Sequence, residues 1–188
     1  ARARTLALEA ARMQHVSLEG LGCHIGSQLL DLAPLARAAE AMAGLVRELR
    51  AADVTLSHID IGGGLGIPQR DTPAPAFEDY VDAVTAPLAD LDVDILSEPG
   101  RAVVGPAGVL LTRVIYLKRR ADYTFALVDG AMNDLLRPAL YAAWHDILPC
   151  RRDPDARPEV LDVVGPVCET ADFLGRGRRL ALAEGDLL

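Results

Sequence analysis

Three short stretches decide the fold of this chain: GLGCHIGSQ at residues 20–28, HIDIGGGLGIP at 58–68 and DILSEPGR at 94–101. Each begins with a short apolar run, typical of a buried strand, and passes directly into glycine and polar residues. The segments between them carry apolar residues at helical spacing. This alternation predicts an α/β fold in which parallel strands are joined by crossover helices.

The elements of this first part follow one another with loops of ordinary length. Strands are predicted at 18–23, 56–61 and 93–96. A helix is predicted over 31–51, because its apolar residues step by three and four along the chain. A second helix includes Phe77 and Val84, and Pro87 is expected to end or kink it because proline has no N–H to donate.

After residue 105 the pattern changes to strands separated by turns. Strands are predicted at 109–117, 123–128, 159–164 and 180–183, with a short helical piece near 135–144. A run of strands after βα units indicates a second, β-rich domain. The predicted domains are therefore residues 1–104 and 105–188.

Composition excludes several kinds of partner and site. The chain has 188 residues, of which 51% are apolar, and a net charge of -8, so it can bury a core but is unsuited to binding nucleic acid. No apolar run approaches the ~18 residues of a membrane span, and the N-terminus lacks a signal-peptide pattern. The three cysteines are too few and too scattered for a disulfide scaffold or a zinc site, which favours a reducing, cytoplasmic compartment.

Residues able to do chemistry follow each of the three predicted strands: HIGSQ at 24–28, GGGLG at 62–66 and EPGR at 98–101. Because ligands bind at the carboxyl ends of parallel strands, we expect these residues to converge on one mouth. Glycine N–H groups there can hold a phosphate, although the GxGxxG and P-loop patterns are absent. Simpler interpretations stay open: the glycines form a tight turn, His24 is a hydrogen-bonded core residue, and Glu98 pairs with Arg101.

The β-rich part adds two candidate clusters. In RPALY at 137–141, a helix would place Arg137 and Tyr141 on one face, where both can donate hydrogen bonds to a carboxylate. The alternative is a surface helix with one buried aromatic residue. Cys168 and Glu169 follow a predicted strand, and the alternative to a reactive thiol is a buried structural cysteine. A further basic cluster is expected to be a solvated turn: Arg176, Arg178 and Arg179.

Five motifs in this order resemble the fold-III pyridoxal-phosphate-dependent decarboxylases: GLGCHIGSQ, HIDIGGGLGIP, SEPGRAVVGPAGVL, VDGAMNDLLRPALY and DVVGPVCETADFLG. Within that family the chain is most similar to enzymes that decarboxylate meso-2,6-diaminopimelate to L-lysine in lysine biosynthesis. The resemblance implies that residues 1–104 are the C-terminal half of an alanine-racemase-like βα (TIM-type) barrel. Residues 105–188 would be part of a C-terminal β-rich domain, in a homodimer with shared active sites.

The resemblance also implies pyridoxal 5'-phosphate as cofactor and a role for each matched residue. His24 would stack on the cofactor ring and Glu98 would pair with its pyridine nitrogen. The cofactor phosphate would be held by Ser27, Gly63, Gly64 and the backbone of Gly100 and Arg101, and Pro99 would also belong to the cofactor-binding residues. The amino-acid substrate would be bound by Arg101, Arg137, Tyr141 and Glu169, the last of these taking the distal ammonium. Cys168, reaching into the partner's site, would be the general acid.

One part of the family pattern is missing. In the family, the lysine that forms the Schiff base lies in an upstream YAxKAN-like motif, whereas the only lysine here, Lys118, lies in YLKRR. The family's late tyrosine that contacts the phosphate is missing too. A complete βα barrel takes about 250 residues, so we expect an internal piece of the enzyme that is inactive alone. The alternatives are a non-catalytic homologue or fragment that keeps a cofactor-binding or dimer scaffold, or a decarboxylase for another amino acid.

Overall fold

The chain divides into two compact units in the computed structural model, which describes residues 2–151 and 154–188. The first unit contains the residues up to Pro68 together with Thr72–Gly108. The second contains Gln69–Asp71 together with Val109–Leu188. Each unit has a hydrophobic core of its own.

The first unit is an α/β structure, as the sequence predicts. Its sheet has the strand order β1 (Gly20–Gly22), β2 (His58–Asp60), β3 (Asp94–Leu96). Neighbouring strands are parallel, and Leu21, Ile59 and Ile95 lie opposite one another. The strands are shorter than predicted, although single bonds such as Ile61 N–H to the Leu96 oxygen (3.0 Å) continue the pairing beyond their ends.

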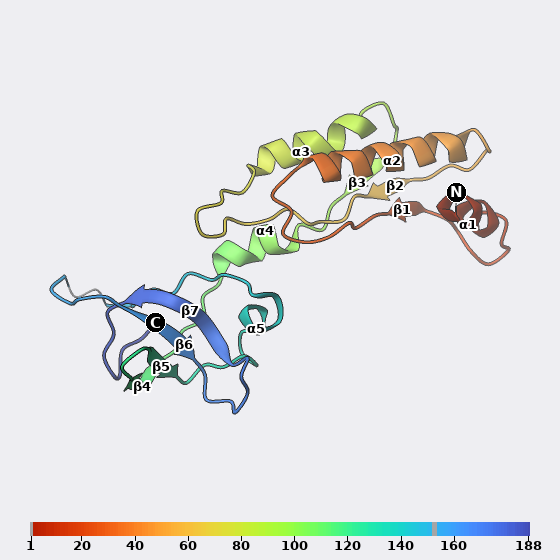
Figure 1. The fold of residues 1–188 in the computed structure, drawn as a ribbon. Helices are drawn as coiled ribbons and strands as arrows, with labels where there is room; N and C mark the ends of the chain where they lie inside the picture. The colour runs from red at the N-terminus through yellow and green to blue at the C-terminus, as the bar shows by residue number, and fades with distance from the viewer. Residues whose placement is uncertain (1, 152–153) are drawn as a thin grey trace. The chain divides into compact units, whose positions relative to one another are not determined.

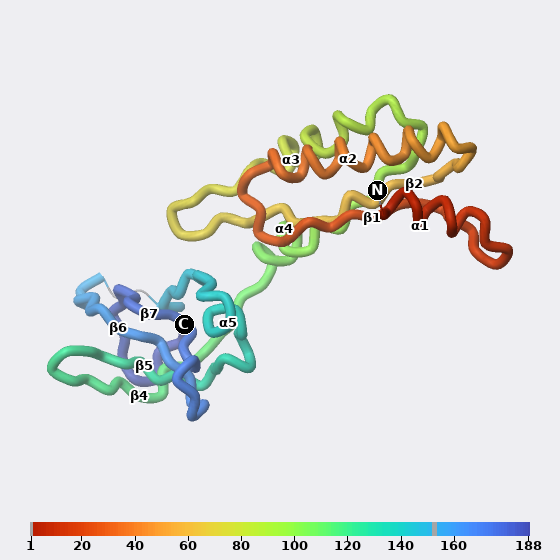
Figure 2. Tube along the Cα trace, turned by 45° about the vertical axis from the view of Figure 1, so that its right-hand side comes forward, coloured from red at the N-terminus to blue at the C-terminus, as the bar shows by residue number. Residues whose placement is uncertain are grey.

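Two helices, α2 (Ala33–Arg50) and α3 (Phe77–Thr85), lie side by side over this sheet (Figures 1 and 2). The buried residues of α2 form the predicted stripe: Leu35, Ala39, Met42, Ala43, Val46 and Leu49. Val46 and Leu49 pack in one core with Ile59, and each such side chain stabilises the fold by about 1.5–3 kcal/mol. The predicted helix is therefore confirmed, and its apolar stripe holds it on the sheet.

Pro87 ends α3, as predicted. The α-helix stops at Thr85, and a 3-10 turn follows at Ala86–Leu88, because the proline nitrogen cannot donate the next helical hydrogen bond. A further helix, α1 (Arg2–Ala10), was not predicted from the sequence. Only Ala7 of α1 is buried, so the helix has no apolar stripe that a sequence pattern could reveal.

The second unit is built on a four-stranded sheet. Its order is β4 (Val114–Arg119), β5 (Thr124–Val128), β6 (Glu159–Val164), β7 (Phe173–Leu180). The central pair β5 and β6 is parallel, and the outer pairs are antiparallel. Alternate residues of β5 point into the core, where Ala126 and Val128 pack with Val163. Two short helices complete the chain: α4 (Gly100–Val104) at the end of the first unit, and α5 (Arg137–Tyr141) between β5 and β6.

Three predictions about this second part are wrong. The strand expected at 180–183 is displaced, because the last strand is β7 and ends at Leu180. The strand expected at 109–117 begins only at Val114, and Val109 is 97% exposed. The arginine cluster expected in a solvated turn lies within β7, where Arg176 and Arg179 are exposed as expected but Arg178 is only 5% exposed. The Arg178 guanidinium carbon lies 3.1 Å from the Trp144 ring centroid, so the buried cation has an aromatic partner. Burial lowers the pKa of the Arg178 guanidinium.

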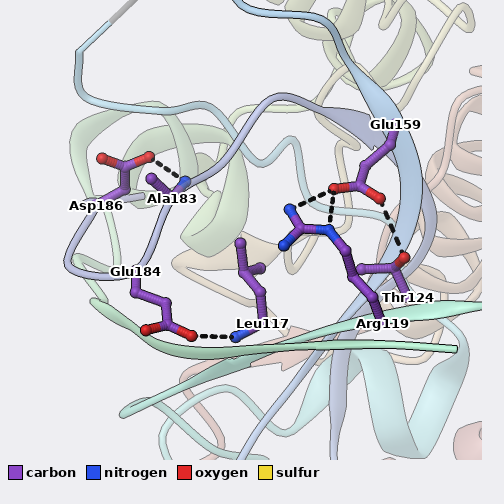
Figure 3. Close-up of polar contacts among 7 residues, drawn as sticks. All are labelled: Leu117, Arg119, Thr124, Glu159, Ala183, Glu184 and Asp186. Atoms are coloured by element: carbon purple, nitrogen blue, oxygen red, sulfur yellow. Dashed lines mark hydrogen bonds and ion pairs between the residues drawn. The ribbon is translucent and has the colours of Figure 1, made fainter.

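A polar cluster joins the strands at one edge of the second unit (Figure 3). Glu159 accepts hydrogen bonds from Arg119 (Nη2, 2.8 Å) and from the Thr124 hydroxyl (3.0 Å). The Arg119 guanidinium holds the pKa of the Glu159 carboxyl below its ordinary value. Nearby, Glu184 accepts the Leu117 N–H at 3.3 Å.

We expect Glu159→Gln to remove part of the acid sensitivity of this unit. Because the folded-state pKa of Glu159 is lowered, the carboxylate stabilises the fold above its unfolded pKa, and that stability is lost as pH falls through the folded pKa. The pair is partly exposed, so the effect should stay below about 1 kcal/mol. Unfolding measured against pH checks this, and Arg119→Ala should flatten the same part of the profile. Identical acid profiles for wild type and both variants would refute the assignment.

Candidate active site

The loops that follow β1 and β2 meet at the carboxyl end of the sheet. Cys23 N–H donates to the Asp60 oxygen (2.9 Å), which carries the strand pairing one residue further and brings His24 beside the glycine run. The Gly63 N–H donates to His24 Nδ1 at 3.3 Å. The His24 and Ser27 side chains are both exposed at this edge and can meet a ligand.

Glycine is required where these loops approach one another most closely. A Cβ atom at residue 63 would overlap the carbonyl oxygen of Glu98. Gly64 has φ +115, and a Cβ there would lie 2.5 Å from the Gly26 oxygen. The Glu98 N–H in turn donates to the Gly62 oxygen at 2.7 Å. The glycine run therefore binds the loops after all three strands to one another.

The structure reveals one further residue in this part of the site, Gln28, for which the sequence predicts no role. Its Nε2 donates to the Ile67 oxygen (2.6 Å), while its Oε1 accepts from the Ile67 N–H (3.3 Å) and from Arg101 Nη1 (3.0 Å). Gln28 thus links the loops after β1 and β2 to α4 and holds the Arg101 guanidinium. Only its place inside the HIGSQ motif could have pointed to it, because its partners lie far away in the sequence.

We expect Gln28→Leu to lower the free energy of unfolding of the first unit by about 1–3 kcal/mol, because the Ile67 N–H and oxygen both lose their side-chain partner. Denaturant unfolding measures this. Gln14→Leu is the matched control, since Gln14 is exposed and makes no hydrogen bond among the residues described. That variant should stay within about 0.5 kcal/mol of wild type. Equal effects of the two substitutions would count against the linking role of Gln28.

In the second unit, α5 forms the arginine–tyrosine pair that the sequence predicts. The Arg137 guanidinium carbon lies 5.1 Å from the Tyr141 ring centroid, so the two side chains share one face of the helix. Tyr141 is 65% exposed, which excludes the alternative of a buried aromatic residue. An exposed hydroxyl beside a guanidinium can bind a carboxylate with two kinds of donor.

Cys168 and Glu169 lie in the loop between β6 and β7. Both side chains are exposed, and Cys168 is a free thiol. The alternative of a buried structural cysteine is therefore wrong for Cys168. The other two cysteines, Cys23 and Cys150, are free thiols as well.

The predicted site residues thus fall into two groups, one in each unit. The first unit holds His24, Ser27, Gly63, Gly64, Glu98, Pro99, Gly100 and Arg101. The second holds Arg137, Tyr141, Cys168 and Glu169. Lys118 is exposed on β4 of the second unit. Within the two described ranges there is no cluster of side chains suited to a metal ion, and no helix long and apolar enough to cross a membrane.

Comparison with known proteins defines the class to which this site belongs. The profile of the family described as "Pyridoxal-dependent decarboxylase, C-terminal sheet domain" matches residues 16–188. The chain belongs to this family of pyridoxal-dependent decarboxylases, which confirms the resemblance drawn from its five motifs.

Within the family, the chain is similar to diaminopimelate decarboxylases. It is 51% identical over 179 residues to the enzyme of Pseudomonas aeruginosa and 46% identical over 181 residues to that of Vibrio cholerae. Each alignment covers 95% of this chain and 43% of the relative. The structure of diaminopimelate decarboxylase from Helicobacter pylori complexed with L-lysine matches with a TM-score of 0.92 and 36% identity, over 99% of this chain and 46% of that one. The chain therefore spans less than half the length of these relatives.

Proposed function

We propose that the complete protein carrying this chain is a decarboxylase that converts meso-2,6-diaminopimelate to L-lysine with pyridoxal 5'-phosphate. The observation that carries the proposal is the Arg137–Tyr141 pair on α5, which offers a carboxylate site to a substrate that still has a carboxylate far from the reacting carbon. Identity of about half to diaminopimelate decarboxylases supports the same substrate. So does the L-lysine in the Helicobacter pylori structure, since lysine is the product of this reaction.

We assign the two units to two parts of such an enzyme. The parallel β1-β2-β3 sheet with helices over it has the form of a segment of a βα barrel, and it fits the C-terminal half of an alanine-racemase-like barrel at 1–104. The four-stranded sheet fits part of the β-rich domain at 105–188. The working enzyme in this proposal is a homodimer in which Cys168 serves the partner's site.

The donor set in the first unit suits pyridoxal 5'-phosphate. His24 offers a ring face, Ser27 a hydroxyl and Glu98 a carboxylate, and all three side chains are exposed at the loops that follow the strands of one sheet. The phosphate would be held by Ser27 with the backbone around Gly63 and Gly64 and the turn that starts α4 (Pro99, Gly100, Arg101). Two backbone donors of this set already have partners, because Gly63 N–H bonds His24 and Gly100 N–H bonds the Glu98 oxygen at 2.8 Å. Ser27 and the remaining backbone N–H groups of this set would therefore be the phosphate donors.

When bound, pyridoxal phosphate withdraws electrons from the carbon that loses carbon dioxide. In our proposal Glu98 holds a proton at the pyridine nitrogen, where a carboxylate is the partner that keeps the nitrogen protonated. Arg101, Arg137 and Tyr141 orient the substrate through its carboxylates, and Glu169 accepts the distal ammonium. Cys168 donates the proton that replaces the departing carboxylate.

The direct experiment is to incubate the complete protein with pyridoxal phosphate and meso-diaminopimelate and to measure carbon dioxide and lysine. We expect both products in equal amounts, with much slower release from ornithine, which has no second carboxylate. Release from ornithine at the same rate would favour a decarboxylase for another amino acid. No release from either substrate would favour a non-catalytic homologue and contradict the proposal.

A further inference from the structure

A buried carboxylate, Asp172, lies at the base of the loop that carries Cys168 and Glu169. It is only 4% exposed. Its Oδ2 accepts the backbone N–H of Val167 at 2.6 Å, and its Oδ1 accepts that of Met132 at 2.7 Å. Burying a carboxylate is costly unless it is hydrogen-bonded, so these two charge-assisted bonds explain how the group is tolerated.

The two donors belong to the two segments that carry the candidate substrate residues. Val167 is the residue directly before Cys168. Met132 lies in a turn closed by the Leu135 N–H, which donates to the Ala131 oxygen at 3.1 Å, and this turn leads into α5. The Asp172 carboxylate therefore forms hydrogen bonds both to the loop that carries Cys168 and to the turn that precedes α5, the helix of Arg137 and Tyr141.

Backbone packing joins the same two segments independently of these bonds. The Gly165 N–H donates to the Asp172 carbonyl oxygen at 3.1 Å, which closes the loop on itself. A Cβ at residue 165 would overlap the Asp172 carboxylate and lie 2.8 Å from the Ala131 Cα. Glycine at 165 thus lets the loop, the carboxylate and the turn before α5 come together, and the arrangement is close-packed.

We infer that Asp172 is a positioning residue, which fixes the Cys168–Glu169 loop relative to the segment that bears Arg137 and Tyr141. This inference deepens the proposed function and rests on it for the roles of those residues. Asp172 itself is buried and acts through its backbone partners. With the carboxylate in place, the loop that carries the thiol toward the partner's site keeps a fixed relation to the segment that bears Arg137 and Tyr141 in its own chain.

Asp172→Asn tests the inference, because an amide keeps the size of the side chain but presents an N–H donor to one of the two backbone N–H groups. In the complete protein we expect kcat for diaminopimelate to fall about tenfold. We also expect the rate at which iodoacetamide alkylates Cys168, followed by mass spectrometry of its peptide, to change by about threefold or more. The matched control is Asp162→Asn, since Asp162 accepts the Gly177 N–H at 2.7 Å elsewhere in the same sheet. That control should leave both rates within about twofold of wild type.

A purely structural role predicts a different pattern. The melting temperature would fall in both variants, while kcat of the folded protein and alkylation of Cys168 would stay at wild-type values, and this result would overturn the inference. If Asp172→Asn does not fold, hydrogen exchange in the wild type decides. Amides in the peptides that contain Val167 and Met132 should exchange at least about tenfold more slowly than in an unstructured chain. Unprotected exchange there would also overturn it. Absence of decarboxylation by the wild type would refute the proposed function, yet alkylation and exchange would still decide the role of Asp172.

Discussion

We expect replacement of Arg137 with alanine to raise the Michaelis constant of the proposed enzyme for diaminopimelate by about 100-fold, because a charged, bidentate partner of the distal carboxylate would be lost. The change in kcat should be smaller, since the group binds the substrate away from the bond that breaks. The expectation depends on the geometry of α5, where Arg137 lies against Tyr141 and both side chains share one face. Steady-state kinetics with varied diaminopimelate measures the effect.

Arg119→Ala is the matched control for this prediction. Arg119 lies on β4 and pairs with Glu159 at 2.8 Å, so its removal deletes an arginine from the same unit without touching α5. The Michaelis constant of this variant should stay within about twofold of wild type. An unchanged Michaelis constant in Arg137→Ala would exclude Arg137 from substrate binding. It would also remove the observation that carries the proposed function.

Gly63→Ala is expected to abolish cofactor binding. A methyl group at residue 63 would overlap the Glu98 carbonyl oxygen, so the loops after β2 and β3 must move apart. Overpacking against backbone costs about 3 kcal/mol, and the displaced loops carry His24 and Glu98 away from each other. Retention of pyridoxal phosphate, measured by its absorbance after gel filtration, should fall below detection. The first unit should also unfold at lower denaturant.

Gly44→Ala provides the comparison, because it adds the same methyl group in the middle of α2. Apart from the neighbouring backbone of α2 itself, no atom lies within 4 Å of that methyl. Alanine is the better helix former, so this variant should be equal to wild type or more stable by up to about 1 kcal/mol. Full cofactor retention in Gly63→Ala would contradict the close packing of the strand-end loops.

The sequence predicts best those elements whose signal is local. Helix α2 has a complete apolar stripe, α3 has Pro87 at its end, and both are found where expected. Helix α1 is missed because it is mostly exposed, and β7 is misplaced because three arginines suggested a solvated turn. Stacking of Arg178 on Trp144 joins residues far apart in the chain, so no local pattern could reveal it.

The candidate site shows the same division. Residues with distinctive chemistry, such as His24, Arg137 and Cys168, can be selected from motifs and their order. Gln28 and Asp172 cannot be selected in this way, because they act through hydrogen bonds to backbone groups. Gln28 bonds Ile67 and Asp172 bonds Met132, each about 40 residues away in the sequence. Asp172 also bonds Val167, the neighbour of Cys168. Motifs therefore identify the groups expected to touch a ligand, and the structure adds the groups that hold them in place.

In the function proposed above, this chain is part of a pyridoxal-phosphate enzyme whose covalent lysine lies outside these 188 residues. The most direct test is the intact mass of the complete protein after incubation with pyridoxal phosphate and reduction with borohydride, followed by peptide mapping. We expect a single stable adduct on a lysine in a peptide absent from this sequence, with Lys118 unmodified. No specific adduct, or one on Lys118, would contradict it.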